Sequence, residues 1–116
     1  MGNESIDLQE VLERVQEDRE LLLELFQIFE EDFNARRAKL QELIKSGDAG
    51  AVRDLTHSMK GAAGNISAKA IHETCSRMEQ LSGSGDLKGV QALIAGLDEQ
   101  FQQALEFINK FRKEAH

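Results

Sequence analysis

The chain has 116 residues, enough for one compact domain with a modest core but not for two. Its only aromatic residues are six Phe, and its formal net charge is −7 at pH 7. Both features argue against a nucleic-acid partner, because single strands stack on Tyr or Trp platforms and phosphate backbones repel acidic proteins. Proline is absent, and Leu, Glu, Gln, Ala, Lys and Arg recur throughout, so we expect a single all-α domain over residues 1–116.

Two helices are predicted in the first 47 residues. Asp7 and Glu10 have the spacing of a capping box, and they begin a short helix that runs to about Gln16. A long helix follows the polar stretch 16–18 and ends at Gly47, because glycine readily adopts the left-handed conformation that terminates helices. The expected core residues of this long helix recur three, four or seven apart: Leu22, Phe26, Phe29, Phe33, Leu40 and Ile44.

Three further helices are predicted in the rest of the chain. Asp48 caps the third helix, Asn65 or Ser67 caps the fourth, which ends before the run 82–85, and Asp86 caps a long last helix. The inward positions are Val52, Leu55, Met59, Ala62 and Ile66 in the third helix, Ile71, Cys75, Met78 and Leu81 in the fourth, and Val90, Leu93, Leu97, Phe101, Ala104, Ile108 and Phe111 in the last.

The lengths of the connections predict the architecture. Short loops place consecutive helices side by side and antiparallel, so we expect an up-down-up-down four-helix bundle with the short N-terminal helix covering one end. The polar helix faces show no second sustained apolar stripe, so we expect a monomer. The single cysteine, Cys75, and the lack of a secretory signal or long apolar run favour the cytoplasm, as a free protein or as the cytoplasmic end of a membrane-anchored one.

A candidate functional patch lies on the predicted third helix. At about 100° per residue, His57 lies opposite the inward stripe, and Lys60, Gly61 and Gly64 lie on the same exposed face. Each exposed helical glycine costs about 1 kcal/mol relative to alanine, and the absent side chains would let another macromolecule approach the imidazole. Lys60 can offset negative charge on a phosphoryl group attached to the ring. The non-functional alternatives are that His57 is a surface histidine without a role and that the glycines only loosen the end of the helix.

The run THSMKGAAGNI at 56–66 closely resembles the His-x-x-Lys-Gly signature of histidine-containing phosphotransfer (HPt) domains. The resemblance extends to the Leu- and Phe-rich second helix, the Ala-Ile-x-x-x-Cys-x-x-Met-Glu pattern at 70–79 and the Gly-Asp turn at 85–86, and so covers nearly the whole chain. It implies a four-helix bundle in a two-component phosphorelay, with receiver domains of hybrid sensor histidine kinases and of response regulators as partners. One departure is Ser67, where many members carry glycine.

The resemblance also implies roles for individual residues. His57 would accept a phosphoryl group from a receiver aspartate and pass it to the aspartate of a response-regulator receiver, with Lys60 as its charge partner. Gly61 and Gly64 would leave room for the receiver's active-site loops. Glu79 matches a position from which some members orient the histidine. This chain would be a phosphoryl carrier without a cofactor or ATP site, and Mg²⁺ would belong to the receiver.

Three alternatives remain at this stage. A histidine kinase dimerisation fragment usually has an acidic residue after the histidine and a proline soon after, whereas Ser58 follows here and the chain has neither a proline nor a Gly-rich nucleotide-binding segment. The phosphoacceptor domain of chemotaxis-type kinases has a similar His-Ser-x-Lys-Gly run, and its donor would be an ATP-bound kinase domain. A third alternative is an adaptor that docks a receiver without accepting phosphate. We expect no metal site, because His57, His72 and His116 are not spaced as ligands on one helix face.

Overall fold

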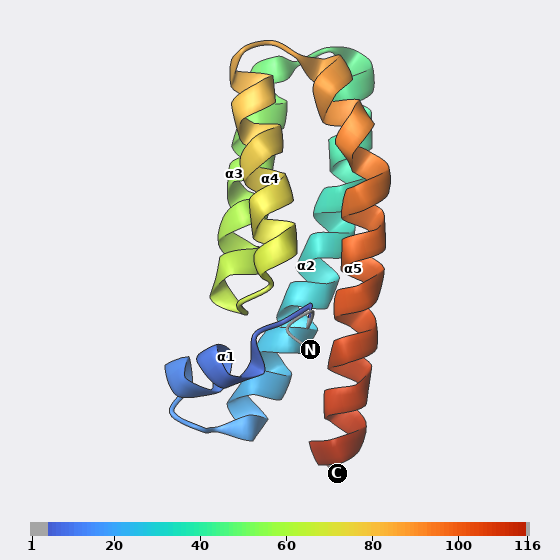
Figure 1. The fold of residues 1–116 in the computed structure, drawn as a ribbon. Helices are drawn as coiled ribbons and strands as arrows, with labels where there is room; N and C mark the ends of the chain where they lie inside the picture. The colour runs from blue at the N-terminus through green and yellow to red at the C-terminus, as the bar shows by residue number, and fades with distance from the viewer. Residues whose placement is uncertain (1–4, 116) are drawn as a thin grey trace.

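The structure is a computed structural model that describes residues 5–115. Its helices are α1 (Leu8–Arg14), α2 (Arg19–Ser46), α3 (Ala49–Asn65), α4 (Lys69–Gly83) and α5 (Leu87–Ala115). Helices α2 to α5 run alternately in opposite directions, and α1 lies at the end of the bundle where α3 connects to α4 (Figure 1). The predicted all-α four-helix bundle with a short N-terminal covering helix is therefore confirmed. Within residues 5–115, no helix is long and apolar enough to cross a membrane.

Aspartate side chains begin four of the five helices. The carboxylates of Asp7, Asp18, Asp48 and Asp86 each accept a hydrogen bond from the backbone N–H three residues further on, at 2.8 to 3.1 Å. These bonds satisfy N–H groups that have no partner inside the helix. Gly47 ends α2 with φ of 75°, the left-handed conformation expected of it. The helix starts predicted at Asp7, Asp48 and Asp86 are confirmed.

The connection from α3 to α4 differs from the prediction. Neither Asn65 nor Ser67 caps α4, which begins after Ala68 without a side-chain hydrogen bond. Ser67 instead turns the chain with φ of 58°, a conformation that glycine adopts more readily, and its buried hydroxyl donates to Glu10 Oε1 over 2.7 Å. The turn is thus fixed by a contact with α1, which local sequence patterns do not reveal.

Helix α4 ends later than predicted. It continues through Ser82, whose buried hydroxyl donates to the carbonyl of Met78 one turn earlier, and ends at Gly83. The hydroxyl keeps its hydrogen bond inside the helix, so the serine does not end it. The left-handed residue needed for the turn is Gly85, with φ of 81°.

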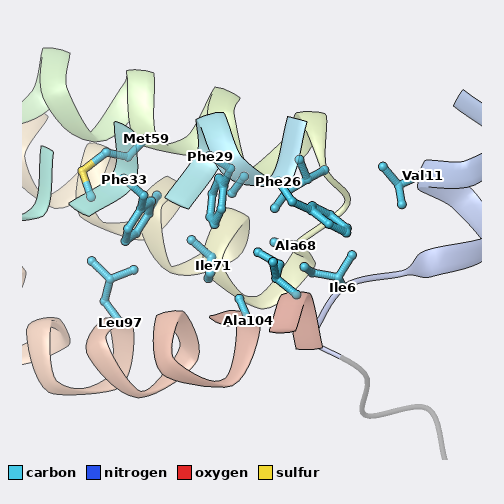
Figure 2. Packing of buried hydrophobic residues seen from close by; sticks show 14 of the residues in the cluster. Ile6, Val11, Phe26, Phe29, Phe33, Met59, Ala68, Ile71, Leu97 and Ala104 are labelled. Carbon is cyan, nitrogen blue, oxygen red and sulfur yellow. The ribbon is translucent and has the colours of Figure 1, made fainter. Parts of the chain in front are cut away.

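The core is organised around aromatic residues of α2. Figure 2 shows Phe33 between Met59 of α3 on one side and Leu97 of α5 on the other, with Phe29 beside Phe33. Phe33 stacks on Phe101 with ring centroids 4.5 Å apart. The fully buried residues of this core include Phe26, Phe33, Ile6, Leu22, Leu40, Met59, Ile71, Met78, Leu97, Ile108, Val11 and Val52. Most of the predicted inward positions are confirmed by this packing.

The buried faces of α3 and α5 differ from the prediction at a few positions. In α3, Thr56 and Ala63 are buried while Leu55 and Ala62 are only half-buried. Helix α3 packs against both α2 and α4, so its buried face is wider than one stripe. Thr56 can be buried because its hydroxyl donates to the carbonyl of Val52 over 2.9 Å. In α5, Ile94 is buried, whereas the predicted Leu93 and Phe101 are half-buried. Ile44 of α2 and Leu81 of α4, also predicted to face inward, are half-buried as well.

Helix α1 is tied to the C-terminal end of α3. The Arg14 guanidinium donates to the carbonyl oxygens of Gly64 and Asn65 over 2.7 and 3.0 Å. These carbonyls belong to the last turn of α3, where helical partners are lacking. The backbone N–H of Asp7 also donates to the carbonyl of Ser67. Helix α1 therefore fixes the end of the helix that carries His57.

Candidate functional site

The candidate site is centred on His57, the ninth residue of the 17-residue helix α3. Its neighbour Thr56 is buried, and the turn of about 100° per residue directs His57 away from the core. The imidazole side chain is 66% exposed. It can therefore be reached by another macromolecule.

The carboxylate of Glu79 on α4 contacts both His57 and Lys60. Its Oε2 lies 2.9 Å from His57 Nδ1, and its Oε1 lies 2.7 Å from Lys60 Nζ. Lys60 is one turn after His57 on α3, so both side chains meet the carboxylate where α3 packs against α4. The exposed fractions are 25% for Lys60 and 24% for Glu79, so both are much less open than the histidine. The residues predicted at 57, 60 and 79 thus form one cluster.

The charge of Glu79 determines which imidazole nitrogen of His57 carries the proton. The hydrogen bond from Lys60, followed by that from His57, holds the pKa of the Glu79 carboxyl below its ordinary value against the opposing effect of burial. The carboxylate is therefore ionised at neutral pH and can only accept hydrogen bonds. His57 Nδ1 must then carry the proton, which leaves the lone pair on Nε2. Among residues 5–115, no group hydrogen-bonds to Nε2.

The two glycines have different surroundings. A Cβ atom at Gly61 would have no neighbour within 4 Å, so this position is open on the exposed face. A Cβ at Gly64 would lie 3.3 Å from Cδ2 of His72, on α4. Gly64 therefore permits close packing of α3 against a side chain of α4, a structural reason that the sequence did not reveal. The prediction that both glycines are open positions on one exposed patch agrees with the surroundings of Gly61 and only in part with those of Gly64.

A groove between α2 and α3 adjoins the histidine. It has a volume of about 490 Å³ and is lined by Leu25, Ile28, Phe29, Asp32 and Arg36 of α2 and by Ser58, Gly61, Ala62, Asn65 and Ile66 of α3. Ile28 is 60% exposed, more than Leu21, the other large apolar residue exposed in the described part of the chain. Sequence reasoning missed this surface. The available signal was the spacing of Leu21, Leu25 and Ile28, which forms a second, short apolar stripe on α2.

Within residues 5–115, neither Cys75 nor His72 belongs to a cluster of possible metal ligands. Among the described residues, no group of three or more His, Cys, Asp or Glu side chains could hold a metal ion, and His116 lies outside them. Cys75 is buried in the core, as predicted, and desolvation raises the pKa of its thiol to about 12.

Comparison with known proteins places this geometry in a family. A model of the Hpt domain family matches residues 24–107, which include His57, Lys60 and Glu79. The chain belongs to the Hpt domain family. This Hpt domain is also similar to the crystal structure of histidine-containing phosphotransfer protein B from Pseudomonas aeruginosa PAO1, with a TM-score of 0.88, 26% identity and 98% of each chain covered. A search of curated proteins gave no significant match.

Membership settles the general activity. This Hpt domain is a histidine phosphotransfer domain of phosphorelays, a phosphoryl carrier and not a kinase, and receiver domains are its general class of partner. The alternative of a catalytic histidine kinase fragment is therefore wrong.

Proposed function

We propose that this Hpt domain accepts a phosphoryl group on Nε2 of His57 from the aspartyl phosphate of a hybrid-kinase receiver and passes it to a response-regulator receiver. The observation that carries the proposal is the cluster of His57, Glu79 and Lys60, which leaves an exposed Nε2 with its lone pair free. Residues 1–116 would form one domain, acting as a monomer in the cytoplasm.

The chemistry requires little from the carrier. The Nε2 lone pair attacks phosphorus in line with the departing aspartate oxygen, while positive charges around the transferring group balance its equatorial oxygens. Lys60 provides one of these charges from the side of the carrier. Mg²⁺ belongs to the receiver, so this chain needs no cofactor of its own.

The receiver must contact the surface around His57, because phosphoryl transfer brings the two reacting side chains within bonding distance. The groove between α2 and α3 shares Gly61 and Ser58 with this surface. Gly61 offers clearance for the receiver's active-site loops, and Gly64, one turn further, keeps α3 close to α4 beside them. Exposed Ile28 provides an apolar anchor at the far side of the groove. We therefore assign the groove to receiver docking.

Transfer from phosphorylated receivers tests the proposal. The parent protein, the His57→Gln variant and the His72→Gln variant are mixed with several phosphorylated receivers, and acid-labile, base-stable label is followed. We expect label on the parent and on His72→Gln, an exposed-histidine control, but not on His57→Gln. Label only from an ATP-bound kinase domain would favour the chemotaxis-type alternative. No label from any donor, with receiver binding retained, would favour the adaptor.

A further inference from the structure

The hydrogen bond between Glu79 and His57 bears on the return of the phosphoryl group as well as on its acceptance. In the forward step, the Nε2 lone pair forms the N–P bond and the P–O bond of the aspartyl phosphate breaks, with its electron pair leaving on the carboxylate. The ring starts neutral with a proton on Nδ1 and becomes a phosphorylated imidazolium. In the return step, the N–P electron pair goes back to Nε2.

The leaving group in that return step depends on the Nδ1 proton. If Nδ1 keeps its proton, the ring leaves as neutral imidazole. If the proton is lost while the phosphoryl group is attached, the ring must leave as an imidazolate anion, a much stronger base and a much poorer leaving group. A histidine in water loses the proton of its imidazolium around pH 6.5, below the pH of most cells. A carrier that works at neutral pH therefore benefits from a group that retains this proton.

Glu79 is placed to do so. Its Oε2 lies 2.9 Å from Nδ1, so the positive charge of a phosphorylated ring would face a carboxylate at hydrogen-bond distance. Lys60, 2.7 Å from Oε1, makes this carboxylate a weaker base and so keeps it from taking the proton itself. Lys60 thus has an effect on the proton as well as on the phosphoryl oxygens.

Charged residues one turn before His57 and across the groove form ion pairs. On α3, Arg53 and Asp54 lie 3.7 Å apart, about one turn before His57. Across the groove on α2, Arg36 and Asp32 lie 3.0 Å apart. Each pair has no net charge and is substantially exposed, so solvent screens it further. Within residues 5–115, Glu79 is the acidic residue at hydrogen-bond distance from Nδ1.

We infer that Glu79 is a positioning residue that holds the proton on Nδ1 of His57 in both the free and the phosphorylated ring, so that phosphoryl transfer in either direction requires no proton transfer. The inference rests on the proposed function, because it takes His57 as the phosphoryl site. It goes beyond orientation of the imidazole, since an uncharged side chain could orient the ring without retaining the proton.

The Glu79→Gln variant separates these roles, because glutamine has nearly the same shape but no charge. Both proteins are phosphorylated chemically with phosphoramidate, and single-turnover transfer to an excess of one receiver is measured from pH 6 to pH 9. The ratio of parent to variant rates cancels the receiver's own pH dependence. At pH 6 we expect the parent and variant rates to agree within about threefold. Above about pH 6.5, where the phosphorylated ring of the variant loses its Nδ1 proton, the ratio of parent to variant rates should rise about tenfold per pH unit. Glu79→Asp should recover part of the parent profile.

A matched control and a spectroscopic measurement complete the test. Glu73→Gln removes the same charge from an exposed position on α4 and should keep the parent profile. Nitrogen NMR of the phosphorylated proteins at pH 8 should show a protonated Nδ1 in the parent and a deprotonated one in Glu79→Gln. A ratio that does not change with pH, or the same Nδ1 state in both proteins, would overturn the inference while leaving His57 as the carrier. Failure of the parent to form phosphohistidine at residue 57 would instead overturn the proposed function.

Discussion

Replacing Gly61 with alanine should stabilise this Hpt domain and impair its activity at the same time. Gly61 lies inside α3, where alanine is favoured over glycine by about 1 kcal/mol. The added methyl group would have no neighbour within 4 Å, so no steric cost reduces this gain. For a chain of this size, about 1 kcal/mol corresponds to a rise of about 4 °C in the melting temperature. The same methyl group would lie where we propose that the receiver's loops contact α3.

The loss of activity can be estimated from the geometry of transfer. A methyl group at a close contact displaces the partner by a fraction of its diameter, and a misplacement of about 1 Å costs on the order of 100-fold in rate. We therefore expect the second-order rate constant for transfer to fall by at least about tenfold. Thermal and urea denaturation followed by circular dichroism measure the stability, and transfer from a phosphorylated receiver measures the activity.

Gly96→Ala is the matched control. Gly96 is an exposed glycine inside α5, and a Cβ there would also have no neighbour within 4 Å. This variant should gain similar stability and transfer phosphate at the parent rate. Unchanged transfer by Gly61→Ala would refute the assignment of Gly61 to clearance for the receiver. A loss of stability would refute the inference that the position is open.

Three other predictions follow from burial and charge. Ile28→Glu should weaken receiver binding by about tenfold or more, since an apolar anchor that becomes buried on binding contributes about 2 kcal/mol, whereas Leu21→Glu, which does not line the groove, should bind normally. Cys75 should resist an aromatic disulfide reagent at pH 8 and react fully in urea, because its thiol is buried and its pKa is raised to about 12; rapid labelling of the folded protein would contradict this. The pKa of Glu79 is lowered by folding, so its stabilising effect is complete above the ordinary value of 4.5 and is lost as the pH falls through the lowered value. The stability difference between parent and Glu79→Gln, measured by urea denaturation, should therefore shrink as the pH falls below 4.5 through the lowered pKa of Glu79.

The architecture was predictable because its determinants are local. Apolar residues at helical spacing, aspartate caps and glycine after α2 are all short-range patterns, and they gave the five helices with errors of a few residues at the ends. The exposed position of His57 followed from the same periodicity. The main error in the core, the burial of Thr56 and Ala63, arose because α3 has two neighbours and a single stripe represents only one.

The parts of the site that depend on contact between helices were less predictable. The distance between His57 and Glu79 joins residues 22 positions apart on two helices, so only the packed structure gives it. The sequence suggested Glu79 solely through family resemblance. Likewise, the turn at Ser67 depends on Glu10, 57 positions earlier, and the packing reason for Gly64 depends on His72. Side chains that act across helices require a knowledge of their relative register.

The location of the proposed phosphoryl site has an evolutionary consequence. His57, Lys60 and Glu79 all lie on the hairpin formed by α3 and α4, whereas Ile28 and Leu25 are supplied by α2. The exposed residues of α2 can therefore change without disturbing the atoms that we propose hold and release the phosphoryl group. A gene duplicate of this domain could acquire a different receiver through a few substitutions on one helix, with its chemistry inherited intact.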